Sequence, residues 1–281
     1  MRTLRYVLCD VFTDRPLTGN PLAVFTDART LNDDTMQAIA REMNLSETVF
    51  VLPPIAGGHA KLRIFTPRAE LNFAGHPTLG SAFVLGGPLQ AEVVRLETGV
   101  GIIPVRLERD AATIAFGWMQ QRVPAVRAFE REAELLTALG VERSLLPVLA
   151  YNNGAQHLFV VVESFDAVRA LKPRLDRVAE LSDVTVNVSA VLGDRVKTRA
   201  FAPAHGIPED PATGSAAGPL AVHLAEHGLA PFGQLLTIEQ GAEIHRPSEL
   251  RAIVRGERGN VSEVEVGGAA LVVGRGELRV A

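Results

Sequence analysis

Residues 210–219 read DPATGSAAGP, and residues 76–82 read HPTLGSA. In each stretch one ionisable residue, Asp210 or His76, precedes a proline and a G-S-A triplet. Proline suits the first turn of a helix, and small side chains leave backbone N–H groups accessible to an anion. The alternative is a flexible linker, because the same residue types are common in linkers. The remainder of the sequence decides between the two.

These stretches belong to an internal repeat. R-I-F-T-P at 63–67 matches R-A-F-A-P at 199–203, an offset of 136 (199 − 63). The two opening stretches match at an offset of 134 (210 − 76), and E-T-G at 97–99 matches E-Q-G at 239–241 at an offset of 142 (239 − 97). One repeat of about half the chain predicts two similar domains. A linker would have no spaced copy, so both stretches are predicted to be strand, turn and helix N-terminus.

Short strand-like runs alternate with a few helical segments, which predicts an α+β fold. Met36, Ile39, Ala40 and Met43 follow the spacing of an amphipathic helix, and the helix that follows Asp210 is expected to end at Gly228. The proline-bearing stretch 121–126 is the candidate linker between domains. The predicted domains are therefore residues 1–121 and residues 122–275.

Composition excludes several classes of function. The chain has 281 residues, of which 47% are hydrophobic, and its net charge of −4 gives no basic surface for nucleic acid. Apolar runs such as 158–162 are too short to span a membrane, and no secretory signal follows Met1, so a cytoplasmic protein is expected. Cys9 is the only cysteine, which excludes an intrachain disulfide, a cysteine-rich zinc site and any mechanism with two thiols.

Two residues are candidates for acid–base chemistry. Glu47, in NLSETVF, stands directly before an apolar strand, where its charged form is disfavoured and its pKa is expected to rise. His76 is the lone ionisable residue of a turn poor in side chains. We expect the two amide-rich helix tips to face each other across a domain cleft and hold a small carboxylate. The residues alone leave two alternatives open, a solvated turn for Glu47 and a structural role for His76.

The sequence resembles the phenazine-biosynthesis PhzF family, which has the diaminopimelate-epimerase-like fold. The resemblance lies in DVFTDRPLTGNPLAVF, AREMNLSETVFVLPP, RIFTPRAELNFAGHPTLGSA, DPATGSAAGPLAVHLAEHG and IEQGAEIHRPSELRA. It implies two pseudo-symmetric α+β domains, each with a curved, mostly antiparallel sheet around a central helix. It also implies a last strand, 276–281, that returns to the first domain, a site between the domains, and a homodimer without cofactor or metal.

The resemblance also implies roles for individual residues. In this family the glutamate of N-L-S-E-T, here Glu47, is the acid–base residue. The positions of His76 and Asp210 assist it and bind substrate. The other substrate-binding residues that the resemblance implies are Asn20, Gly75, Thr213, Gly214 and Ser215.

The prototype reaction of the family is the isomerisation of trans-2,3-dihydro-3-hydroxyanthranilate. The glutamate removes a proton from C3 and returns it at C1, and the resulting enol becomes a ketone. Related epimerases use two opposed cysteines where this chain has Ala74 and Thr213, so inversion of an amino-acid stereocentre by that route is not expected. Asn72, Ala74 and Pro211 depart from the pattern of relatives and bear on substrate choice.

Other readings of the sequence are less well supported. His223 to His227 form H-x-x-E-H, but no third ligand stands out and histidines suit the C-terminal end of a helix, so no metal site is predicted. Ser215 lacks the two glycines of a nucleophile elbow, because Thr213 and Ala217 occupy those places. The alternative function is a non-catalytic small-molecule-binding or interaction protein of the same fold, which would be expected to lack Glu47, His76 or Asp210.

Overall fold

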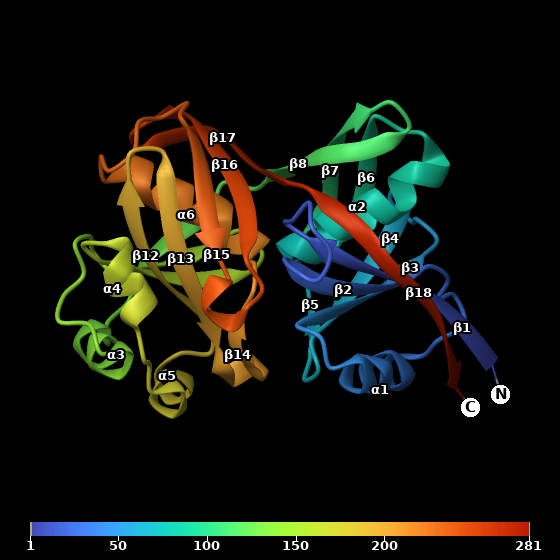
Figure 1. The fold of residues 1–281 in the computed structure, drawn as a ribbon, viewed down its shortest axis with the longest axis horizontal. Helices are drawn as coiled ribbons and strands as arrows, with labels where there is room; N and C mark the ends of the chain where they lie inside the picture. Colours follow the sequence, from blue (N-terminus) through green and yellow to red (C-terminus); the bar gives the residue numbers. More distant parts are fainter. Residues whose placement is uncertain (1, 281) are drawn as a thin grey trace. The chain divides into compact units, whose positions relative to one another are not determined.

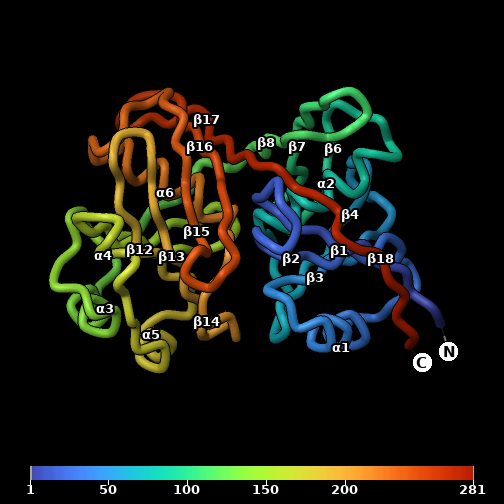
Figure 2. Tube along the Cα trace, in the orientation of Figure 1, coloured from blue at the N-terminus to red at the C-terminus, as the bar shows by residue number. Residues whose placement is uncertain are grey.

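The computed structural model describes residues 2–280 and divides the chain into two compact units. The first unit contains Met1–Gln120 together with Gly267–Ala281, and the second contains Gln121–Val266. Figure 2 shows the red C-terminal segment returning to the blue N-terminal strand, with which it pairs along its length. The segment that returns to the first unit therefore begins at Gly267, earlier than the expected residue 276.

The first unit is a mixed sheet with the strand order β18-β1-β2-β3-β4-β6-β7-β8 (Figure 1). The β2–β3 and β4–β6 pairs are parallel and the other pairs are antiparallel, while the short β5 pairs with β4. The strands are β1 (Arg2–Val11), β2 (Asn20–Phe25), β3 (Glu47–Leu52), β4 (Ala60–Phe65), β5 (Glu70–Leu71), β6 (Val93–Thr98), β7 (Gly101–Asp110), β8 (Thr113–Gln121) and β18 (Ala270–Val280).

Two helices cover opposite faces of this sheet. Helix α1 (Asp33–Met43) is capped by Asn32, whose side chain accepts from the Thr35 N–H, and it buries the apolar stripe predicted from its spacing. Helix α2 (Gly75–Leu89) is buried on nearly all sides and contacts β1, β2 and β3 as well as β6 and β7. A helix that touches strands far apart in one sheet requires the sheet to curve around it.

The second unit repeats this architecture. Its strands pair in the order β9-β10-β11-β12-β13-β15-β16, with β11–β12 and β13–β15 parallel, and β14 pairs with β13 as β5 pairs with β4. The strands are β9 (Ala125–Ala128), β10 (Leu149–Asn152), β11 (Gln156–Val161), β12 (Thr185–Leu192), β13 (Arg195–Ala202), β14 (Ile207–Asp210), β15 (Leu235–Gln240), β16 (Ser248–Glu257) and β17 (Asn260–Gly268).

The helices of the second unit also lie on two faces of its sheet. Helix α6 (Gly214–Glu226) takes the place of α2 and is buried along almost its whole length. The outer face carries α3 (Glu132–Leu139), α4 (Phe165–Ala170) and α5 (Leu175–Leu181), which pack on a core of alternate residues from β10 to β13. The pseudo-symmetric α+β fold expected from the sequence is confirmed.

Equivalent ion pairs define how the two units correspond. Arg63 contacts both carboxylate oxygens of Glu70 at 2.7 and 2.6 Å, and Arg199 contacts those of Glu209 at 2.9 and 2.7 Å. The arginines differ by 136 positions, as the sequence match predicts, but the glutamates differ by 139 (209 − 70). The second unit thus has three additional residues between these two positions.

The helix starts keep the offset of 139. Ala74 O accepts the first helical N–H of α2, from Thr78, and Thr213 O accepts those of Ala216 and Ala217 in α6. Gly75 and Gly214 are therefore equivalent, which makes Ser215 the counterpart of His76. The sequence alignment of His76 with Asp210 was wrong by five residues, because the matched G-S-A triplets lie in different helical turns.

The candidate linker 121–126 begins where the two units meet along the chain, because the first unit ends at Gln120, but both of its ends lie in strands. Gln121 is the last residue of β8 and is buried, and Val126 belongs to β9, where it pairs with Tyr151. Only residues 122–124 lie outside strands, since Pro124 lacks the N–H that a strand needs for pairing.

In the part of the chain that the structure describes, no helix has the length and apolar character required to cross a membrane.

Candidate active site

Glu47 and His76 lie in contact in the first unit. Glu47 is the first residue of β3 and its side chain is 11% exposed, while His76 is the second residue of α2 and its side chain is 3% exposed. His76 Nδ1 lies 3.5 Å from Glu47 Oε2. The parallel pairing of β2 with β3 places Glu47 opposite Leu22, at the same end of the sheet as Asn20. A buried carboxyl and a buried imidazole thus share one polar site.

The imidazole of His76 is neutral near pH 7. Burial lowers its pKa to about 3, because desolvation disfavours the charged form. Its contact with Glu47 is therefore not an ion pair. Asn20 Nδ2 lies 3.2 Å from Nδ1 of the same ring, and with this amide donating, the ring proton is on Nε2. Nε2 is buried and has no hydrogen-bond partner within residues 2–280, so its N–H is suited to donate to a ligand.

The start of α2 leaves backbone donors beside these side chains. Ala74 precedes the helix in an extended conformation and has no polar side chain with which to cap it. The first-turn N–H groups, including those of Gly75 and His76, have no partner within an α-helix. Directly before the neighbouring strand β2, Gly19 has a φ of +69°, and a Cβ there would collide with Val11 O. Glycine is thus required for the turn that delivers Asn20.

In the second unit Asp210, Thr213 and Gln240 form a buried network. Thr213 Oγ1 donates to Asp210 Oδ2 at 2.6 Å and accepts from Gln240 Nε2 at 2.9 Å. Gln240 Nε2 also donates to Asp210 O at 2.8 Å, and Gln240 Oε1 accepts from the Thr213 N–H at 3.1 Å. Asp210 ends β14, and all three residues are less than 9% exposed.

Two further amides hold the first turn of α6. Pro219 has no N–H to donate to Ser215 O four residues earlier, and Asn153 Nδ2 donates to that carbonyl instead, at 2.9 Å. Gln121 Nε2 donates to Gly214 O at 2.8 Å, and its Oε1 accepts from Asn153 at 3.1 Å. Asn153, in the turn between β10 and β11, thus compensates for the proline, and Gln121, at the end of β8, supports the same first turn of the helix that carries Gly214 and Ser215.

The predicted site residues form two sets. Glu47, His76, Asn20 and Gly75 lie together in the first unit, and Asp210, Thr213, Gly214 and Ser215 lie together in the second. That both sets act on one substrate stays a prediction. The three supporting amides, Gln121, Asn153 and Gln240, were not predicted from the sequence. Of these only Gln240 carried a signal, since it lies in the repeated E-Q-G triplet, whereas nothing local distinguished Gln121 and Asn153.

The residues of the H-x-x-E-H pattern make contacts of other kinds. His223 Nδ1 lies 2.9 Å from the Tyr151 hydroxyl, and His227 Nδ1 lies 2.9 Å from His223 O. Both carboxylate oxygens of Glu226 accept from the Gly259 N–H. Across residues 2–280, no group of three or more His, Cys, Asp or Glu side chains is placed to hold a metal ion.

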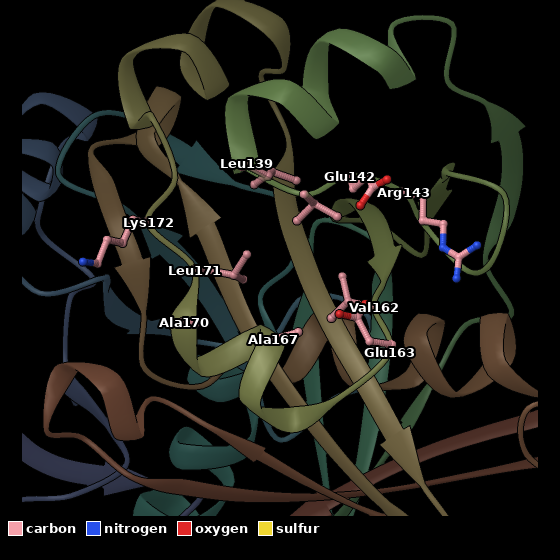
Figure 3. A pocket seen from close by; sticks show the side chains of 11 residues that line it. Leu139, Glu142, Arg143, Val162, Glu163, Ala167, Ala170, Leu171 and Lys172 are labelled. Atoms are coloured by element: carbon pink, nitrogen blue, oxygen red, sulfur yellow. The ribbon is translucent and has the colours of Figure 1, made fainter.

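A cavity of about 710 Å³ lies on the outer face of the second unit (Figure 3). Its lining comes from the end of α3, the end of β11 and the α4 region, and includes Glu142, Arg143, Glu163 and Lys172. These four charged side chains are exposed, and no predicted site residue belongs to the lining. Figure 3 shows Arg143 and Lys172 on opposite sides of the cavity, so they do not converge on one anion.

Comparison with known proteins identifies the family. Residues 9–276 match the family described as phenazine biosynthesis-like protein (PhzC-PhzF). The chain is 48% identical to trans-2,3-dihydro-3-hydroxyanthranilate isomerase of Pseudomonas aeruginosa, over 98% of this chain and 99% of that one. It is likewise 48% identical to the isomerase of the same name from Pseudomonas fluorescens, over 97% of this chain and 98% of that one. The chain belongs to the PhzC-PhzF family.

Solved structures agree with this assignment. A phenazine biosynthesis protein of the PhzF family from Bacillus anthracis is 25% identical, with a TM-score of 0.86 and complete coverage of both chains. A predicted epimerase from Pseudomonas aeruginosa is 32% identical, with a TM-score of 0.85 over 99% of this chain and 100% of the other. A probable proline racemase from Agrobacterium radiobacter, 12% identical with a TM-score of 0.73 over 99% and 93% of the two chains, shares the fold alone.

Proposed function

We propose that this protein is an isomerase that moves a proton within trans-2,3-dihydro-3-hydroxyanthranilate, in the synthesis of phenazine-type compounds. The similarity at 48% identity to isomerases named for this substrate supports the proposal. The observation that carries it is the buried Glu47 carboxyl beside the neutral His76 imidazole. That pair can transfer one proton without a cofactor.

In the proposed mechanism, Glu47 acts as both base and acid. Its carboxylate takes the proton from C3 of the ring, the electron pair of that C–H bond enters the conjugated system, and the same carboxyl returns the proton at C1. The product is an enol isomeric with the substrate, which then becomes the ketone. His76 does not neutralise the carboxylate, because its ring is uncharged, and its Nε2–H can donate to an oxygen or nitrogen of the substrate.

Residues of the second unit are proposed to bind the substrate carboxylate. The N-terminal N–H groups of α6 favour an anion, and Gly214 and Ala216 leave the backbone accessible around Ser215. The Ser215 hydroxyl adds a donor, and Asp210 supplies a group that can bind the substrate amine. We propose Thr213 as a contributor to this site through its contact with Asp210.

Glu47→Gln tests the function most directly. The amide has the shape of the carboxyl but cannot exchange a proton, so kcat is expected to fall by about 10²–10⁴-fold. With the native enzyme in deuterated water, NMR of the product is expected to find at most one deuteron at C1, apart from any deuteron that a ring carbon gains when the enol becomes the ketone, and the variant is expected to form no labelled product.

The matched control is Glu42→Gln, a substitution on the exposed face of α1 in the same unit. It is expected to leave kcat within about twofold of native, as exposed substitutions have little effect. Absence of turnover by the native protein would reject the proposed substrate. Native-like turnover by Glu47→Gln would reject Glu47 as the acid–base residue.

A further inference from the structure

We infer that Gln240 is a positioning residue that orients Asp210 through the hydroxyl of Thr213. The inference rests on the proposed function, in which Asp210 faces the substrate. Gln240 is 2% exposed, and its side-chain amide contacts three polar atoms of the turn between β14 and α6.

The orientation of the Gln240 amide follows from its partners. The Thr213 N–H can only donate, so the atom 3.1 Å away is Oε1. Asp210 O can only accept, so the atom 2.8 Å away is Nε2. Neither contact allows the amide to be reversed. Nε2 therefore also donates to Thr213 Oγ1.

The direction of the next hydrogen bond follows in turn. Because Thr213 Oγ1 accepts from Gln240, its own proton is directed to Asp210 Oδ2, 2.6 Å away. That separation is typical of a hydroxyl bonded to a carboxylate. Oδ2 thereby accepts a hydrogen bond from within the turn, which fixes the rotation of the carboxyl group. Gln240 thus orients the carboxyl group of Asp210 through Thr213.

The first unit shows that the fold does not need the hydrogen bonds that link Gln240, Thr213 and Asp210. The positions equivalent to Asp210, Thr213 and Gln240 hold Leu71, Ala74 and Thr98, and the Thr98 hydroxyl donates to Gly101 O. The corresponding turn is held there by a backbone bond from Gly99 N–H to Asn72 O, at 2.8 Å. Strand, turn and helix form equally well without the polar chain, so the chain in the second unit serves the site.

The test combines Gln240→Met, Thr213→Val and their double variant with measurement of kcat, KM and the pH profile. Each single variant is expected to lower kcat about 10–100-fold, as for other residues that orient a site group, with a smaller effect on KM. Because Gln240 acts through Thr213, the double variant is expected to be no worse than about threefold below Thr213→Val. Thr213→Ser retains the hydroxyl and is expected to stay within about threefold of native. Thr98→Val is the matched control and leaves kcat unchanged.

A second measurement is independent of turnover. In the native protein the side-chain NH₂ protons of Gln240 are expected to exchange slowly by NMR, and Thr213→Val is expected to shift their resonances while Thr98→Val does not. Rapid exchange of these protons, or resonances that do not shift in Thr213→Val, would overturn the inferred chain of hydrogen bonds from Gln240 through Thr213 to Asp210, whether or not the proposed substrate is turned over. Multiplicative loss of kcat in the double variant would also overturn it. Failure of the native enzyme alone to turn over the substrate would count against the proposed function instead.

Discussion

His157 is a buried ionisable residue outside the proposed site. It is 1% exposed, neither ring nitrogen has a hydrogen-bond partner within residues 2–280, and burial lowers its pKa to about 3. An unfolded histidine titrates near 6.5, so below that pH the unfolded chain binds a proton that the folded chain does not. The free energy of unfolding therefore falls as the pH drops from about 6.5 towards 3, by up to about 1.4 kcal/mol per pH unit for each such group.

His157→Leu is expected to remove one such contribution. Between pH 7 and pH 5 this variant should lose about 2 kcal/mol less stability than the native protein, as followed by urea unfolding. His76 and His223 remain buried with pKa values of about 3, so part of the acid sensitivity persists. His245→Asn, an exposed position with a left-handed backbone that asparagine tolerates, is expected to leave the pH dependence unchanged. Equal pH dependence of His157→Leu and native protein would contradict the assignment.

At the scale of single residues, sequence reasoning selected groups with chemistry of their own. Glu47 and His76 were selected because one carboxyl precedes an apolar strand and one imidazole lies in a turn of small residues, and the structure brings the two into contact. Asn153 and Gln121 could not be selected in this way. Their role depends on two carbonyl groups in the first turn of a helix distant in sequence, Ser215 O, which Pro219 leaves without a helical donor, and Gly214 O, and no local pattern encodes these contacts.

At the scale of elements, helices α2 and α6 each contain a glycine followed by a proline, but the two glycines differ in their surroundings. A Cβ at Gly218 would collide with Gln121 Oε1 and lie 2.7 Å from Val264 Cγ1, whereas nothing lies within 4 Å of one at Gly87. Gln121 cannot move aside without losing its hydrogen bonds to Gly214 O and Asn153. Gly218 therefore allows the helix to approach the amide that holds its first turn.

Gly218→Ala is expected to be about 1–3 kcal/mol less stable than Gly87→Ala. Both substitutions place alanine before a proline inside a helix, so that penalty is common to them and cancels in the comparison. Urea unfolding of the two variants measures the difference. Equal stabilities would show that the Gln121 amide relaxes freely and does not constrain α6.

At the scale of the whole molecule, the repeat could be predicted and its register could not. The matches at 63–67 and 97–99 located the two halves correctly. Arg63 and Arg199 pair with equivalent glutamates, and a Cβ at Gly99 or Gly241 would meet the equivalent residues Asn72 or Pro211. The alignment of His76 with Asp210 failed, since three residues were added between Arg199 and Glu209 relative to the first unit. Short identities cannot locate such an addition.

The homodimer stays a prediction, which light scattering would check.

The equivalent arginines Arg63 and Arg199 allow a test of whether burial makes one of two equivalent ion pairs contribute more to stability. Arg199 and Glu209 are each 10% exposed in their side chains, and Arg199 also donates to Leu171 O at 2.8 Å, whereas the Glu70 partner of Arg63 is 42% exposed. Arg199→Ala leaves a buried carboxylate unpaired and is expected to cost about 3–5 kcal/mol, against about 1 kcal/mol for Arg63→Ala. By hydrogen exchange, Arg199→Ala should increase exchange in β13, β14 and the end of α4 and leave β4 and β5 unchanged. Equal losses of stability in the two variants would mean that burial does not distinguish the equivalent pairs.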